Sequence, residues 1–245
     1  MNHDDESRRP RRGLITFLAI VFLILSAAVV FKFTCRLENV EIRPGKYYTE
    51  DEIRKKLFTK ATDDYAVLFA YRINNIAKTT LPCVEKIDVE LVDRNSVIIT
   101  VYDRAVTGCL EHMGTYLYFD IAGTVVDSSN VRLSGIPLVK GIEASSYTLG
   151  KQLYVGEKPV FTDIANIVML MESNGLNTEE LEFGIRNEIT VRSSGNEILL
   201  GNSEYYDYKI NNLPGMLQAL GEGSYRIDLR NNTENNPDAS ARRIE

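Results

Sequence analysis

The sequence predicts an α+β protein with a single N-terminal transmembrane helix and two folded domains after it. Three observations lead to this class. An uncharged apolar run covers residues 14–31. Residues 35–104 show one strand pattern, two helix patterns and then two strands separated by a short turn. From residue 105 onwards, short alternating segments between turn residues predict a mixed, strand-rich domain with flanking helices.

The apolar run, LITFLAIVFLILSAAVVF, has Thr16 and Ser26 as its polar side chains. About 18 helical residues span roughly 27 Å, which is close to the hydrocarbon thickness of a bilayer. The run therefore predicts a transmembrane helix over residues 14–33. A cleaved signal peptide is the alternative, because basic residues precede the run and small residues occupy positions 26–28. The apolar run is longer than an ordinary signal-peptide core and continues to Phe31, which favours the anchor.

Charge asymmetry predicts the orientation of this helix. Four arginines lie between residues 8 and 12, whereas the nearest cations after the helix are Lys32 and Arg36. Because cytoplasmic flanks carry the excess of Lys and Arg, the N-terminus should stay in the cytoplasm. Residues 1–13 are then a short cytoplasmic tail, and the domains after the helix are extracytoplasmic.

Composition limits the class of protein further. The 245 residues are 44% hydrophobic and 25% charged, which is ordinary for folded domains with real cores. A net charge of −6 argues against a nucleic-acid-binding surface. Cys35, Cys83 and Cys109 are an odd count at wide spacing and do not make a disulfide framework. Whether Cys83 and Cys109 form a bond stays open at this point.

The first domain is predicted over residues 35–104. Alternation over residues 37–42 predicts a strand, and the Thr49–Glu52 spacing predicts a capping box that opens a helix to about residue 58. A second helix is predicted over residues 65–78. Residues 87–102 form the clearest hairpin pattern in the chain. Two helices on one face of a three-stranded sheet let each element bury its apolar side.

The second domain is predicted over residues 105–232. Its predicted extended segments are 106–111, 116–120, 124–127, 136–141, 181–183, 188–192, 197–200 and 225–230. One helix is predicted between Thr162 and Gly175, and another opens at Ser203. Pro214 predicts a break in that second helix. The polar residues 233–245 predict a flexible C-terminal tail.

The residues that carry chemistry are sparse. Cys109-x-x-His112 is half of a zinc site, and no second pair follows at zinc spacing. Asp120 and Asp127 flank a hairpin, where Asp commonly makes turns. The sequence contains none of the phosphate-binding, dinucleotide-binding or nucleophile-elbow motifs. We therefore predict no catalytic residue, metal site, cofactor or small-molecule substrate.

Several short motifs, taken in order, resemble the FtsQ/DivIB family of bacterial cell-division proteins. The motifs are Pro82-x-Val84, Lys86-Ile87-Asp88-Val89, Val97-x-Ile99-x-Val101-x-Asp103-Arg104, Tyr118-Phe119-Asp120-x-x-Gly123, Ile136-Pro137-Leu138-Val139-x-Gly141, Leu200-Gly201, Lys209-Ile210 and Ile227-Asp228-Leu229-Arg230. Together with the basic tail and the membrane helix, the resemblance covers about residues 8–232.

The resemblance implies a fold and a function. It implies a POTRA domain after the anchor and an FtsQ-type β domain after that. It also implies a non-enzymatic divisome scaffold that binds FtsB/DivIC-type and FtsL-type proteins and helps control septal peptidoglycan synthesis. The expected location is the cell membrane at the division septum, as a single-pass protein. The alternatives are a membrane-anchored cell-wall enzyme and a polypeptide-transport POTRA protein.

The resemblance also places the partner contact on the final strand and the helix before it. Residues 225–230 are the last predicted strand, and a strand added last commonly lies at a sheet edge with unpaired N–H and C=O groups. Such an edge accepts an extended segment of another protein. Carried over by position, the contact residues are Arg226, Asp228, Arg230, Asn231 and Thr233, with Tyr205, Lys209 and Leu213 behind them. The clustered tyrosines of this helix also favour a protein interface.

Overall fold

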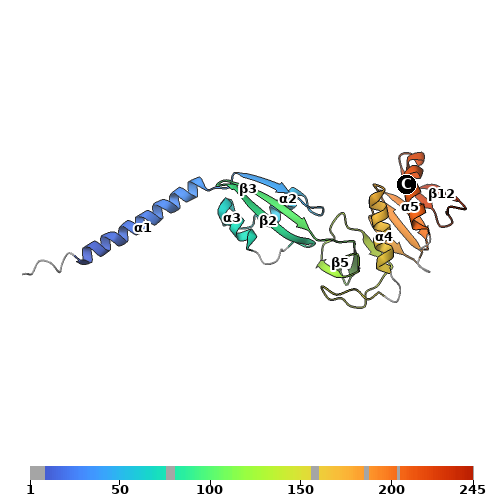
Figure 1. Ribbon diagram of the computed structural model, residues 1–245, viewed down its shortest axis with the longest axis horizontal. Helices are drawn as coiled ribbons and strands as arrows, with labels where there is room; N and C mark the ends of the chain where they lie inside the picture. The colour runs from blue at the N-terminus through green and yellow to red at the C-terminus, as the bar shows by residue number, and fades with distance from the viewer. Residues whose placement is uncertain (1–8, 76–80, 156–159, 185–187, 203–204, 245) are drawn as a thin grey trace, which may run out of the picture. The chain divides into compact units, whose positions relative to one another are not determined.

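The computed structural model describes residues 9–75, 81–155, 160–184, 188–202 and 205–244 (Figure 1). The chain divides into two compact units. The first contains residues up to Thr79 together with Lys86–Tyr102, and the second contains Thr80–Glu85 and Asp103–Glu245. The predicted boundary after residue 104 lies two residues beyond this division. Residues 1–8 of the predicted tail, residues 76–78 of the predicted second helix and Ser203 lie outside the described residues.

The N-terminal helix α1 covers Arg9–Thr34 (Figure 1). Within it, Gly13–Thr34 is long and apolar enough to cross a membrane. Its apolar side chains, such as Leu18 and Phe22, are exposed rather than packed against the rest of the protein. A helix with this composition on every face is suited to lipid. The single apolar helix of the prediction is therefore present, and it begins before residue 14.

The first unit is a three-stranded sheet with two helices. Its elements are β1 (Asn39–Arg43), α2 (Glu50–Leu57), the 3-10 helix η1 (Ala61–Asp64), α3 (Ala66–Asn74), β2 (Val84–Asp93) and β3 (Ser96–Asp103). The sheet order is β1-β3-β2, and β1 runs parallel to β3. The predicted order of strand, two helices and two strands is confirmed.

Local sequence explains where these elements begin and end. The hydroxyl of Thr49 accepts a hydrogen bond from the N–H of Glu52, whose carboxylate accepts one from the N–H of Thr49 at 2.9 Å. This is the predicted capping box, and it satisfies two N–H groups at the start of α2. Between β2 and β3, the Asp93 carboxylate accepts from the N–H of Asn95 at 2.7 Å and stabilises the turn. The hydrogen bond from Asn95 is also the largest cause of the lowered pKa of Asp93.

The second unit is a nine-stranded mixed sheet with two helices. Its strands are β4 (Gly108–His112), β5 (Thr115–Phe119), β6 (Val125–Ser129), β7 (Leu138–Lys140), β8 (Glu180–Phe183), β9 (Ile189–Ser193), β10 (Asn196–Gly201), β11 (Ser224–Asp228) and β12 (Ser240–Ile244), and its helices are α4 (Val160–Ser173) and α5 (Tyr206–Leu220). The strand order is β12-β11-β10-β9-β8-β7-β4-β5-β6. This sheet matches the prediction of a strand-rich unit with flanking helices.

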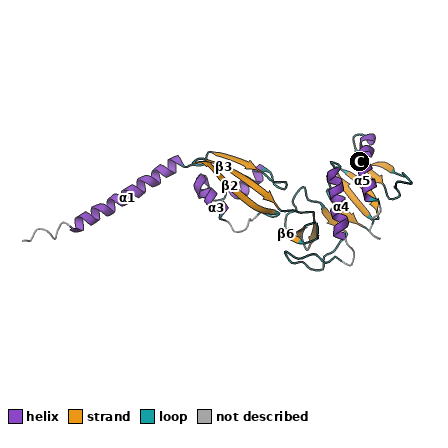
Figure 2. Ribbon diagram, viewed as in Figure 1, coloured by secondary structure: helices purple, strands orange, loops and turns teal. Residues whose placement is uncertain are grey.

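One face of this sheet forms the core. Figure 2 shows α4 and α5 together over the strands of the C-terminal half of the sheet. Ile164 of α4 and Ile210 of α5 join Val191, Ile198 and Ile227 of the strands in one buried cluster. Because side chains alternate along a strand, the residues between these apolar positions lie on the opposite face of the sheet.

Two predictions for this unit are wrong. The helix does not break at Pro214, because α5 continues to Leu220. Pro214 removes one helix donor, but Leu213 is fully buried and Met216 and Leu217 pack on the same core, which holds both halves in line. The C-terminal tail is not loose over residues 240–244, because these residues form β12 and pair antiparallel with β11.

The cysteines Cys83 and Cys109 are free thiols and fully buried. Burial raises the pKa of Cys109 to about 12 and moves the pKa of Cys83 further above its usual range. Both side chains therefore stay protonated and unreactive at neutral pH.

Candidate functional site: the C-terminal sheet edge

The C-terminal end of the nine-stranded sheet is formed by β12 and not by β11. A turn at Thr233–Asn236 reverses the chain, with the N–H of Thr233 donating to the carbonyl of Asn236 at 2.9 Å. The chain then returns so that Arg242 lies opposite Arg226 of β11. The prediction that the last strand before the tail is the sheet edge is therefore wrong, since five residues of the tail cover it. Without β12, the outer side of β11 would present a row of unpaired N–H and C=O groups, and the tail pairs with these groups.

The backbone alternation of β11 shows which groups of β12 face outwards. Tyr225 donates its N–H to the Asn196 side chain of β10, and Leu229 donates to the Leu199 carbonyl of the same strand. The alternate residues of β11, including Arg226, therefore direct their N–H and C=O groups towards β12. The β12 residues that pair with them, such as Arg242, direct their own N–H and C=O groups back towards β11. Ala241 and Arg243 consequently direct their N–H and C=O groups away from the sheet.

The opposite end of the same sheet is different. Val125 of β6 donates its N–H to the Lys151 carbonyl at 3.0 Å and accepts from the N–H of Gly150 at 2.8 Å. The segment 150–153 thus covers the first part of the β6 edge. Within the described part of the chain, β12 is the more open of the two ends.

Charged side chains form a row across strands β8 to β12, on the face of the sheet opposite the helices. The strand registers place Glu180, Arg192, Glu197, Arg226 and Arg242 opposite one another, one on each strand from β8 to β12. We call these five residues the charge row. The Nε of Arg192 lies 3.5 Å from a carboxylate oxygen of Glu180, and its Nη2 lies 3.5 Å from one of Glu197. Arg226 is hydrogen-bonded to Glu197.

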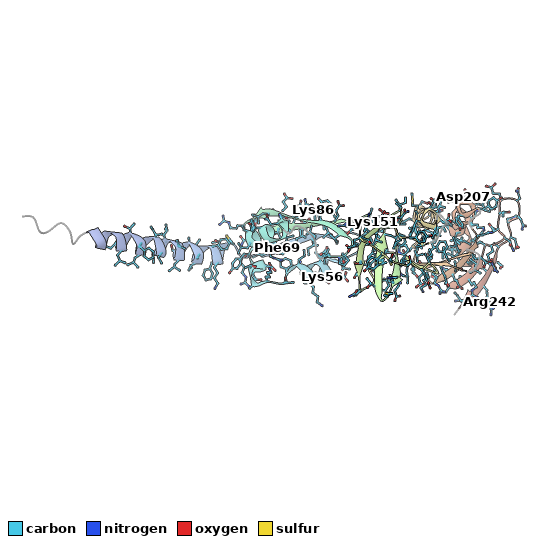
Figure 3. All side chains as sticks on the ribbon, turned by 90° about the horizontal axis from the view of Figure 1, so that it is seen from below. Lys56, Phe69, Lys86, Lys151, Asp207 and Arg242 are labelled. Atoms are coloured by element: carbon cyan, nitrogen blue, oxygen red, sulfur yellow. The ribbon has the colours of Figure 1, made fainter. Side chains whose placement is uncertain are left out.

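The charge row alternates in sign until its last member. Arg226 and Arg242 are like charges on paired strands, which is an unfavourable cross-strand pair. Arg242 is exposed on the outermost strand, where it is labelled in Figure 3. A carboxylate on a strand added outside β12 would restore the alternation.

The predicted contact residues fall into two groups. Exposed or half-buried side chains belong to Arg226, Asp228, Arg230, Asn231, Thr233 and Tyr205. The Arg230 guanidinium lies 2.6 Å from the Asp228 carboxylate, and its hydrogen bonds lower the pKa of Asp228. Asn231 lies in the turn after β11, and Thr233 begins the next turn. Neither is a member of a strand, so the expected ladder donor at Asn231 is not found.

Lys209 and Leu213 are buried, and their predicted contact with a partner is not supported by their positions. The Lys209 ammonium donates to the Leu200 carbonyl at 2.7 Å and to the Arg230 carbonyl at 3.3 Å. This buried cation therefore ties α5 to the end of β10 and to the turn after β11. Leu213 is part of the core. Both side chains therefore support the C-terminal strands from the interior of the unit.

Tyr205 is separated from the β11 residues. It is the N-cap residue before α5, with a left-handed backbone (φ 63°), and it lines a groove of about 540 Å³ between α4 and α5 together with Met169 and Tyr206. Arg226 and Asp228 lie on the sheet face opposite the helix layer. The structure therefore brings Arg226, Asp228 and Arg230 together on or just after β11, one strand inside the edge, and leaves Tyr205 on another surface.

The residues considered for catalysis have other roles. Asp120 accepts hydrogen bonds from the N–H groups of Ala122 and Thr124, both at 2.9 Å, so its predicted turn-making role is confirmed. Asp127 accepts from the N–H of Cys83 at 2.9 Å. The His112 ring packs edge-on against a tyrosine. Throughout the described ranges, no group of three His, Cys, Asp or Glu side chains is placed to hold a metal ion.

The charge row and β12 were not predicted from the sequence. The four members on β8 to β11 each lie next to a buried apolar residue in their strand, as Arg192 lies beside Val191, and this alternation is visible in the sequence. The alignment of five strands in register is not visible there. No model of a known protein family matches the chain, and no curated protein matches it either.

Proposed function

We propose that this chain is a membrane-anchored, non-enzymatic scaffold of the bacterial divisome. In this proposal it binds FtsB/DivIC-type and FtsL-type partners and helps control septal peptidoglycan synthesis. The order β1-α2-α3-β2-β3 supports a POTRA assignment for the first unit, and the apolar helix α1 supports a single-pass anchor. The second unit would correspond to the FtsQ-type β domain.

The observation that carries the proposal is the open edge at β12. Its side chains are almost entirely exposed, and Ala241 and Arg243 present main-chain groups to an incoming strand. Strand addition uses such groups for affinity and side chains for choice of partner. Arg242 selects a partner strand that carries an acidic residue opposite it. The partner therefore docks on β12, with the Asp228–Arg230 pair beside it.

Co-purification tests the function. Full-length chain with an N-terminal affinity tag, isolated in mild detergent from dividing cells of its own species, should bring down an FtsB/DivIC-type and an FtsL-type protein identified by mass spectrometry. The control is a chain that ends after Tyr102 and retains α1 and most of the first unit. It should lose both proteins. Retention of cell-wall hydrolases or secretion components instead of these partners would contradict the proposal.

Topology is a separate prediction. The N-terminus should be cytoplasmic and residues 35–245 extracytoplasmic, because the arginines precede the span. Protease added to cells with a permeable wall should digest the second unit and leave the N-terminal tag protected until the cells are lysed. A full-size protein that keeps its tag excludes cleavage near Ala28. Protection of the residues beyond Lys32 in intact cells would overturn the orientation.

A further inference from the structure

The helix α3 is apolar on both of its faces. Ala66, Phe69, Ala70 and Ile73 are buried, with Phe69 stacked on Phe58 in the core of the first unit (Phe69 is labelled in Figure 3). On the other side, Val67 and Leu68 are about 40% exposed and Tyr71 is 70% exposed. We call these three residues the outward face of α3. An apolar face of this kind on a helix needs a covering surface.

The single charged residue of α3 does not belong to the outward face. The Arg72 guanidinium lies 2.8 Å from the buried Asp63 carboxylate and donates to the Leu57 carbonyl at 2.7 Å. Asp63 also accepts from the N–H groups of Thr59 and Lys60. The cation is thereby held against the first unit, and the outward face presents two aliphatic side chains and a phenol.

Contacts within the first unit place the start of α3 beside the end of the membrane span. The rings of Phe31 and Tyr65 are stacked with centroids 5.6 Å apart, and Tyr65 is the N-cap of α3. The N–H of Leu37 donates to the Asp64 carbonyl at 2.7 Å. The Asn95 side chain donates to the Arg36 carbonyl at 2.7 Å. The segment that leaves α1 is therefore fixed both to the residues before α3 and to the β2–β3 turn.

We propose that the outward face of α3 lies in the headgroup region of the bilayer that α1 spans. This inference rests on the proposed membrane anchor. Phe31 lies in the last turns of the span, so the residues stacked on it are at the boundary of the hydrocarbon. Leu68 is about one helical turn from Tyr65, and Tyr71 is six residues away, roughly 9 Å along the axis. Tyrosine is favoured at this depth because its ring is apolar and its hydroxyl is wet.

The consequence is that the first unit is fixed to the lipid surface by two contacts, the span and α3. Its opposite end is then directed away from the membrane. Tyr102 lies near the end of β3, six residues beyond Ser96, and is 49% exposed. At about 3.3 Å per residue this places it roughly 20 Å from the β2–β3 turn, outside the headgroup region.

The chain contains no tryptophan, so single substitutions report membrane depth without background. Full-length Tyr71→Trp and Leu68→Trp, reconstituted into phosphatidylcholine vesicles, should show blue-shifted emission and quenching by lipids brominated high on the acyl chain. Tyr102→Trp is the matched control, since it makes the same exchange of an exposed aromatic residue in the same unit. Its emission should be red-shifted and unaffected by brominated lipid.

Leu23→Trp separates failure of this inference from failure of the anchor. Quenching of the indole at position 23 without quenching at positions 68 and 71 would overturn the contact of α3 with lipid and leave the anchor intact. The outward face of α3 would then be a contact surface for another protein. Absence of quenching at position 23 would overturn both proposals, because α3 is placed by the span.

Discussion

Ala241→Pro should weaken capture of the proposed FtsB/DivIC-type partner by about tenfold or more. Proline removes the N–H that Ala241 directs away from the sheet, and one main-chain hydrogen bond contributes about 1 kcal/mol, to which the clash of the proline ring adds. The variant should fold normally because the hydrogen bonds between β11 and β12 come from the alternate residues of β12. Binding is measured with full-length chain in nanodiscs and immobilised partner.

Two comparisons sharpen this prediction. Ala241→Val keeps the donor and suits a strand, so it should bind like the parent. Deletion of residues 240–245 removes the docking strand and should abolish capture. If that deletion instead strengthens capture, the partner pairs with β11, and β12 is a competitor that occupies its place. If neither change matters, the interface lies outside this edge.

Gly141→Ala should unfold the second unit or lower its stability by several kcal/mol. Gly141 has a φ of +76°, and a Cβ there would lie 1.9 Å from the main-chain oxygen of Phe183 in β8. A backbone atom cannot move aside without breaking the pairing of β7 with β8, so the clash adds to the cost of the left-handed conformation. Thermal unfolding of the purified full-length chain in detergent, followed by circular dichroism, measures the loss.

Gly135→Ala is the matched control for Gly141→Ala. Gly135 has nearly the same φ of +75°, but no heavy atom lies within 4 Å of the position of its Cβ. It should lose only the roughly 1–2 kcal/mol that the left-handed conformation costs a residue with a side chain. Equal losses in the two variants would show that the approach of Phe183 is not responsible. The loss of stability in Gly141→Ala would then come from the left-handed backbone conformation alone.

The parts of the fold that depend on neighbouring residues were predictable. Thr49 and Glu52 form the expected capping box because both partners are three residues apart. Asp93 forms the expected turn for the same local reason. The run over residues 14–31 predicted the apolar helix because a membrane span is defined by composition and length alone.

The candidate site was harder to predict because it depends on long-range pairing. Ser240–Ile244 has no alternation of apolar residues, and it becomes a strand only because β11 offers it an edge. Lys209 shares the helical stripe of Tyr206 and Leu213, a spacing that indicates burial, but its charge suggested a surface position. Its carbonyl partners come from β10 and from the turn after β11, which no local pattern reveals.

The two arginines of β12 also bear on homotypic assembly. An open strand edge is a template for pairing with the same strand of another molecule, the usual origin of edge-to-edge aggregation. If two β12 strands approached antiparallel and centred on each other, Arg242 of one would face Arg242 or Arg243 of the other. Like charges directly opposite are unfavourable. The β12 edge therefore disfavours pairing with a second copy of itself, which protects the protein against edge-to-edge aggregation.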